Sequence, residues 1–155
     1  MTAERLPDRQ FASNRRAHYE YSILETLEVG IALTGTEIKS VRAGRVNLRE
    51  AYAKVERGEL WLYNAHISPY DAGNRYNHEP TRTRKLLAHT REIAKLRARS
   101  SESGCTLVPL RMYDRHGHAK LELAIARGKH NYDKRAVLAE RDAKRDIERA
   151  RKGDY

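Results

Sequence analysis

The residues of this sequence best suited to chemistry are cations that stand close to aromatic side chains. The segment RTRK, residues 82–85, offers three cations: Arg82, Arg84 and Lys85. The polar loop before it offers stacking surfaces at Tyr70, Tyr76 and His78. Cations attract phosphate groups and aromatic rings stack on unpaired bases, so this segment is a candidate RNA contact. The same residues are equally typical of a solvated surface loop.

The charge of the whole chain favours the binding interpretation. Its 155 residues include 31 Lys and Arg against 21 Asp and Glu, a formal net charge of +10. Residues 61–100 hold eight of the cations and three of the acids, which is half of that surplus. Nucleic acid is the commonest anionic partner of so basic a chain. We therefore expect an RNA partner, with ribosomal or transfer RNA considered first.

Catalysis and metal binding find little support in the sequence. His116 and His118 are separated by one residue, but zinc needs further ligands and no cysteine stands near them. The acids are scattered singly among cations, without a nucleophile motif or a phosphate-binding glycine loop. We predict a protein that is not an enzyme, with no metal site and no cofactor. A metal-dependent nuclease stays open as an alternative, because separated acids such as Glu28 and Asp114 can converge in a fold.

The elements that must position these residues are mainly strands. Apolar residues alternate from Tyr21 to Leu33, which predicts a long half-buried strand with a bulge or bend at Gly30. Tyr19 and Tyr21 stand at its start, where they either pack in the core or stack on bases. Glu28 lies on its polar face, where it either pairs with a cation or accepts a hydrogen bond from RNA.

The next segment has the signals of a short helix. Thr34 can cap the backbone N–H three residues on while Glu37 reaches back, and Gly44 ends the turn. Ile38 and Val41 are predicted to face the core. The first long strand is therefore followed directly by a capped helix.

Two hairpins and a second helix complete the predicted fold. The hairpins turn at residues 57–58 and 114–118, and the helix runs from about residue 90 to 99. Curved strands with inserted short helices in a basic chain favour a mainly β fold, an OB-fold-like closed β-barrel. A two-layer α+β sandwich stays possible. We expect a flexible N-terminal arm at 1–14, an OB-fold RNA-binding domain at 15–130 and a basic C-terminal tail at 131–155.

The two ends of the chain differ from the middle. The tail has eight cations, six acids and only three large aliphatic side chains. So little apolar surface cannot offset the entropy of ordering, and we predict a tail that is disordered in the free protein. The N-terminus has no apolar signal region, and no stretch approaches the roughly 20 apolar residues that cross a bilayer. We expect a cytoplasmic protein without a membrane partner.

Six motifs, in this order, resemble the family of SsrA-binding proteins, also called small protein B. They are NRRAHYEY, ALTGTEIKSVRAGRVNLREAYA, GELWLYNAHISPY, TRTRKLL, CTLVPLRMY and GKHNYDKR. The resemblance runs from about residue 14 to the end of the chain. It implies an OB-fold that binds the tRNA-like domain of transfer-messenger RNA (tmRNA) and delivers this RNA to stalled ribosomes. There, in trans-translation, the ribosome is rescued and the incomplete peptide is tagged.

The resemblance also implies roles for particular residues. Glu28, Leu87 and Lys120 correspond to family residues implicated in tmRNA binding. Tyr19 takes the place of a histidine found in some relatives and keeps an aromatic surface there. Together with the cations and tyrosines already named, the candidate RNA-binding residues are Tyr19, Tyr21, Glu28, Arg82, Arg84, Lys85, Leu87, Lys120, Arg127 and Lys129.

For the tail, the resemblance implies a role on the ribosome. The residues that correspond to family positions near the decoding centre are Tyr132, Asp133, Lys134 and Arg135. We expect the tail to become helical in an empty mRNA channel, against small-subunit ribosomal RNA. The predicted partners are thus tmRNA and the stalled ribosome, bound by a monomer. An OB-fold ribosomal or ribosome-assembly protein that binds structured RNA stays the alternative.

Overall fold

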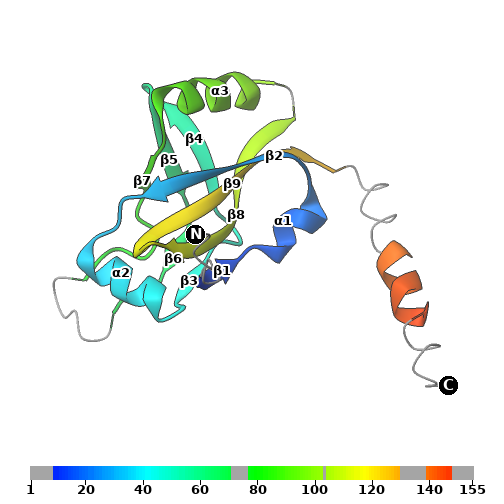
Figure 1. The fold of residues 1–155 in the computed structure, drawn as a ribbon, viewed down its shortest axis with the longest axis horizontal. Helices are drawn as coiled ribbons and strands as arrows, with labels where there is room; N and C mark the ends of the chain where they lie inside the picture. Colours follow the sequence, from blue (N-terminus) through cyan, green and yellow to red (C-terminus); the bar gives the residue numbers. More distant parts are fainter. Residues whose placement is uncertain (1–8, 71–76, 103, 130–138, 148–155) are drawn as a thin grey trace, which may run out of the picture.

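The computed structural model describes residues 9–70, 77–102, 104–129 and 139–147. Strands dominate it, and short helices connect or flank them (Figure 1). In chain order the elements are β1 (Gln10–Ser13), α1 (Arg15–Glu20), β2 (Tyr21–Ile31), α2 (Gly35–Arg42), β3 (Val46–Asn47), β4 (Tyr52–Glu56), β5 (Glu59–Tyr63), β6 (His66–Ile67), β7 (Arg84–Leu87), α3 (Thr90–Ser100), β8 (Cys105–Arg115) and β9 (His118–Gly128). The predicted mainly β fold with short helices is confirmed.

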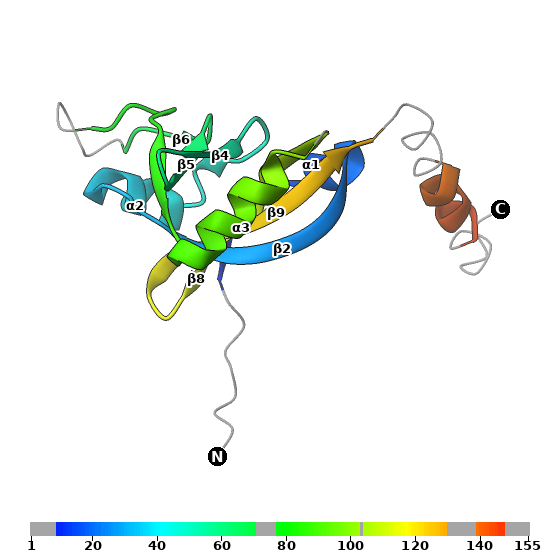
Figure 2. The same cartoon turned by 90° about the horizontal axis from the view of Figure 1, so that it is seen from above.

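Backbone pairing joins most of these strands into one sheet. Their order is β1-β8-β4-β5-β7-β2-β9, and β8 also pairs with β9. Following the pairs from β8 through β4, β5, β7, β2 and β9 therefore leads back to β8. Strands β3 and β6 form a separate two-stranded sheet. Figure 1 shows α3 above the strands and α2 below them, and Figure 2 shows how strongly β2 curves.

Both predicted hairpin turns are confirmed. Arg57 and Gly58 have φ angles of 52° and 75°, and His116 and Gly117 have φ angles of 53° and 81°. Positive φ at two successive residues is the turn geometry that matches the right-handed twist of paired strands. Each turn thereby sets the register next to it, which for β8 and β9 starts at Arg115 and His118 and shifts between Pro109 and Arg111.

Gly30 has a different role from the one its sequence suggested. The register between β2 and β9 shifts between Ile23 and Glu25, so of the two predicted alternatives at Gly30, a bulge or a bend, the bulge is wrong. Gly30 instead pairs with Leu87 of β7 on one side and with Lys120 of β9 on the other. A Cβ atom at Gly30 would lie 3.2 Å from the Cβ of Leu87, closer than side chains normally approach. Glycine thus allows β7 to come close to β2 at this point.

Helix α2 begins with the predicted capping box. The Thr34 hydroxyl accepts from the Glu37 N–H at 3.4 Å, and the Glu37 carboxylate accepts from the Thr34 N–H at 2.9 Å. Val41 is buried as predicted, but Ile38 is 39% exposed, so its placement in the core is wrong. The reason is helical geometry: Glu37 and Val41 are four residues apart and share the buried face, which turns Ile38 towards solvent.

The ordered chain begins before residue 14. Gln10–Ser13 form β1, which pairs with β8, and the buried Asn14 caps α1. The Asn14 amide also donates to the carbonyls of Leu48 at 3.2 Å and Pro109 at 2.9 Å. The expected flexible arm is therefore wrong for residues 10–14, because the edge of β8 and two carbonyls supply partners. Residues 1–8 lie outside the described ranges.

Part of the C-terminal tail is helical. Residues 139–147 form a helix in which every residue is exposed. The expectation of a tail that is disordered in the free protein and helical on the ribosome stays a prediction. The segment consists largely of good helix formers, and Glu140 and Lys144 stand in the favourable i, i+4 order. The other residues of the tail, including the four predicted to lie near the decoding centre, are outside the described ranges.

A buried ion pair joins α2 to β7. Glu37 and Arg84 are both 0% exposed, and the guanidinium of Arg84 donates to the Glu37 carboxylate. Arg84 also donates to the carbonyl of Ala65 at 2.7 Å and to that of Pro80 at 3.1 Å. Arg82 donates to the other Glu37 oxygen at 2.6 Å. The pair therefore holds together α2, β7 and the segments around residues 65 and 80.

Removal of Arg84 should destabilise the protein strongly. Arg84→Ala leaves the buried Glu37 carboxylate with Arg82 as its remaining charged partner, and breaking a buried ion pair typically costs about 3–5 kcal/mol in the free energy of unfolding. Chemical denaturation measures this loss. Lys85→Ala is the matched control, because Lys85 pairs with Glu59 on the surface at 3.2 Å, and such pairs contribute about 0–1 kcal/mol. Equal losses in the two variants would contradict the structural role of Arg84.

Glu37 should also make the unfolding free energy of the protein depend on pH in the acidic range. Burial alone would raise the pKa of Glu37, but hydrogen bonds from Arg82, the Thr34 N–H and Arg84 outweigh burial and lower it. A lowered pKa in the folded state favours folding above the unfolded-state value of about 4.3, and this contribution disappears as pH falls through the folded-state pKa. We expect the unfolding free energy of Glu37→Gln to be lower than that of the wild-type protein at neutral pH, and to fall less as the pH is lowered. Parallel curves for the two proteins would show that Glu37 does not contribute.

Candidate nucleic-acid interface

Three of the candidate RNA-binding residues meet in one open hollow, which we call the Lys120 hollow. Glu28 comes from β2, Leu87 from the end of β7 and Lys120 from β9. The residues that line it are Glu28, Gly30, Leu87, Ala88, His89, Glu92 and Lys120. Because Gly30 pairs with both Leu87 and Lys120, and Glu28 lies two residues away on the same strand, backbone pairing alone brings the three side chains together.

Glu28 is held in place by residues of β8. The Tyr113 hydroxyl and the Arg115 guanidinium both donate to its carboxylate. Tyr113 is 2% exposed, and burial together with the hydrogen bond to Glu28 raises the pKa of its hydroxyl, which therefore stays a proton donor. The positive charge of Arg115 balances the negative charge of Glu28. The ion pair that the sequence left open for Glu28 is thus formed, and it leaves the carboxylate fixed at the hollow.

Lys120 and Leu87 give the hollow its other two properties. Lys120 is half-buried and makes no ion pair with any residue in the described ranges, so its charge is available to a phosphate group. Leu87 is a large aliphatic side chain that is 52% exposed. Exposed apolar surface rimmed by polar groups is typical of binding sites. The hollow therefore offers a cation, a fixed acceptor and an apolar surface within one concavity.

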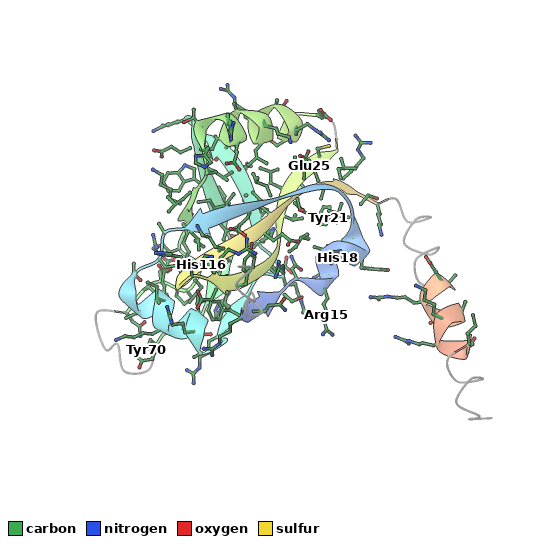
Figure 3. The ribbon with its side chains drawn as sticks, in the orientation of Figure 1. Arg15, His18, Tyr21, Glu25, Tyr70 and His116 are labelled. Atoms are coloured by element: carbon green, nitrogen blue, oxygen red, sulfur yellow. The ribbon has the colours of Figure 1, made fainter. Side chains whose placement is uncertain are left out.

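A second group of candidates lies at the opposite end of the β2–β9 pair. Tyr21 begins β2 and pairs with Gly128, next to Arg127 and Lys129. The Lys129 ammonium donates to the carbonyl of His18 at 3.1 Å, which fixes it against α1. Tyr19 lies in α1 and is half-buried. Figure 3 shows His18 on α1 and Tyr21 close to it at the start of the strand.

The basic segment at residues 82–85 does not form one cluster of exposed cations. Arg84 is fully buried against Glu37, so its prediction as an RNA contact is wrong. Arg82 is partly exposed and also pairs with Glu37, whereas Lys85 points outward and pairs with Glu59. The physical reason is strand alternation: Arg84 and Leu86 share the buried face, and Lys85 and Leu87 share the exposed one.

Tyr113 and Arg115 are site residues that the sequence did not reveal. They contact Glu28 although they lie 85 and 87 residues further along the chain. No local pattern signals this contact, because it depends on how β2 and β8 pair with opposite edges of β9. The signal that could have found Tyr113 is the hairpin turn, because the register that follows from it sets Tyr113 opposite Lys120.

Two further properties bear on what the described residues can do. They contain no group of three or more His, Cys, Asp or Glu side chains placed to hold a metal ion. No helix within the same ranges is long and apolar enough to cross a membrane.

Fold and site together define a class: a small basic, mainly β protein with a surface concavity that offers a cation, a carboxylate acceptor and an apolar side chain. A family model described as "SmpB protein" matches residues 11–153, and the chain belongs to this family. The resemblance inferred from the six motifs is therefore confirmed.

Relatives and a solved structure agree with this assignment. The SsrA-binding protein of Carboxydothermus hydrogenoformans is 58% identical over 144 residues, which cover 93% of this chain and 97% of the relative. That of Geobacillus kaustophilus is 59% identical over 139 residues, 90% of each chain. A chain from a structure described as "tmRNA-SmpB: a journey to the center of the bacterial ribosome" is 47% identical, with a TM-score of 0.67 over 81% of this chain and 87% of that one.

Loss of the Lys120 charge should weaken RNA binding. Lys120→Ala removes a cation that is not paired within the described part of the chain, so we expect lower affinity and a salt dependence reduced by about one phosphate contact. Binding titrations at several salt concentrations measure both. Lys54→Ala, an exposed lysine on β4, is the control and should change binding little. An equal effect of the two substitutions would reduce Lys120 to a part of the general positive charge.

Proposed function

We propose that this protein binds the tRNA-like domain of tmRNA and delivers tmRNA to stalled ribosomes for trans-translation. The observation that carries the proposal is the convergence of Glu28, Leu87 and Lys120 in the Lys120 hollow. These are the three residues that the family resemblance implicated in tmRNA binding. Relatives named SsrA-binding protein, more than 50% identical over almost the whole chain, support the same conclusion.

Each residue of the hollow has a defined physical task in this function. Lys120 attracts a phosphate group, and the exposed Leu87 packs against a sugar or base. Glu28 accepts a hydrogen bond from a base N–H or a ribose hydroxyl. Because Arg115 balances its charge, the carboxylate does this without strongly repelling neighbouring phosphates. The tasks are complementary to folded RNA and involve no bond made or broken, so the protein acts as a binding protein and not as an enzyme.

The proposed scaffold is an OB-fold barrel that acts as a monomer in the cytoplasm. The cyclic order of strand pairs, in which β9 returns to β8, supports barrel closure. Closure removes most free sheet edges, and β1 covers part of β8. A barrel would hold the Lys120 hollow and the Tyr21 end of β2 at a fixed distance, so that one protein can contact RNA at two places.

The tail is proposed to act after tmRNA is bound. Tyr132 and the Asp133–Arg135 motif would lie near the decoding centre, and the helical segment beyond them would occupy the mRNA channel. Messenger RNA in the channel would exclude the tail, so that only stalled ribosomes without downstream message accept it. The helical propensity of residues 139–147 supports this part, since a segment that readily forms a helix loses less entropy on entering a tunnel.

A truncation separates the two steps. Full-length protein and a protein ending at His130 are titrated with the tRNA-like domain of tmRNA, and an elongator tRNA is the control. We expect both proteins to bind the tRNA-like domain alike and to prefer it, whereas only full-length protein supports peptide tagging on stalled ribosomes. Loss of RNA binding on truncation would show that the tail is part of the RNA-binding surface. Equal affinity for both RNAs would favour a general ribosomal or assembly protein.

A further inference from the structure

An apolar pocket adjoins the Lys120 hollow and has no role in the function described so far. It has a volume of about 240 Å³ and lies between β2, α2 and the tip of the β8–β9 hairpin. Its apolar lining comes from Phe11, Ile31, Leu33, Ile38, Val41 and Ala119. It shares Gly30, Leu87 and Lys120 with the hollow, so the two cavities adjoin at these residues.

Two exposed aliphatic side chains mark the entrance of this pocket. Leu87 is 52% exposed and Ile38 is 39% exposed, and both line the pocket. Ile38 is exposed because the capping residue Glu37 takes the buried face of α2. Paired exposed hydrophobic residues at the mouth of a concavity are typical of a ligand site.

The lining of the pocket also carries polar groups that indicate the kind of ligand. Arg42, His118 and Lys120 also line the pocket, and the charges of Arg42 and Lys120 give it a positive character suited to phosphate. Asp114 lines the pocket and is half-buried, and its carboxylate can accept a hydrogen bond from an N–H donor on a ligand.

We propose that this pocket binds one unstacked nucleotide of the RNA held by the Lys120 hollow. The base enters between Ile38 and Leu87, and one of its N–H groups donates to Asp114, while the phosphate stays near Arg42 and Lys120. The size fits, because an engineered cavity of about 150 Å³ holds a benzene ring and this pocket is large enough for one base. The inference rests on the proposed function and adds the unit of RNA that is recognised.

A fluorescent base locates the nucleotide. 2-Aminopurine replaces the unpaired nucleotides of the tRNA-like domain one at a time, and each RNA is titrated with full-length protein. We expect a rise in fluorescence at one position, where the base leaves its stack and enters the pocket. An abasic substitution at that position should weaken binding roughly tenfold, the scale of one lost base contact.

Matched substitutions connect this signal to the pocket. Ile38→Glu places a carboxylate at the entrance, and Leu24→Glu places the same charge at a residue of similar exposure, 43%, outside the pocket. Ile38→Glu should abolish the fluorescence rise and make the abasic substitution harmless, because the two changes remove the same contact. Leu24→Glu should keep both effects. Both side chains are exposed, so both variants should fold, which thermal unfolding verifies.

The outcomes separate this inference from the proposed function. If wild-type protein binds the tRNA-like domain but no position responds, or if both variants behave alike, the pocket does not hold a base although the function stands. If Ile38→Glu weakens ribosome binding and leaves the titrations with the tRNA-like domain unchanged, the occupant belongs to the ribosome and the inference is wrong. Absence of any binding by wild-type protein would overturn the function and this site together.

Discussion

The buried pair of Glu37 and Arg84 is the interaction on which the site depends. Two charges without access to water need good geometry and additional hydrogen bonds, and here Arg82 and the carbonyls of Ala65 and Pro80 supply them. Because side chains alternate along a strand, holding Arg84 inside places Leu87 outside. A slip of β7 by one residue would bury Leu87 and expose Arg84. The pair therefore specifies the register that creates the exposed surface.

The Lys120 hollow follows from this register and from one glycine. Gly30 lies between Leu87 and Lys120 in the sheet, and its missing side chain lets β7 approach β2. Glu28, on the same strand, is fixed by Tyr113 and Arg115 from β8. Residues from four strands are thus placed by backbone pairing before any RNA arrives, so binding does not have to order them. Such preorganisation reduces the entropy lost on association.

Local signals in the sequence predicted much of this fold. Alternating apolar residues predicted β2, the Thr34 capping box predicted α2, and glycines predicted both hairpin turns. The burial of Arg84 could not be predicted in the same way, because a cation in a basic segment is usually exposed and its partner Glu37 lies 47 residues away. Tyr113 and Arg115 were not predicted for a similar reason. Strand β1 was not predicted because it forms only by pairing with β8. Family resemblance supplied Glu28, Leu87 and Lys120, whereas their shared hollow required the three-dimensional pairing.

RNA binding at the Lys120 hollow can be tested by mapping the contact on the protein. Backbone amide signals of the full-length protein are followed by NMR while the tRNA-like domain of tmRNA is added. We predict that the largest changes occur at residues 28–30, 87–89 and 118–120, with little change in the β4–β5 hairpin. Changes confined to that hairpin or to α3, with the hollow unaffected, would contradict the account.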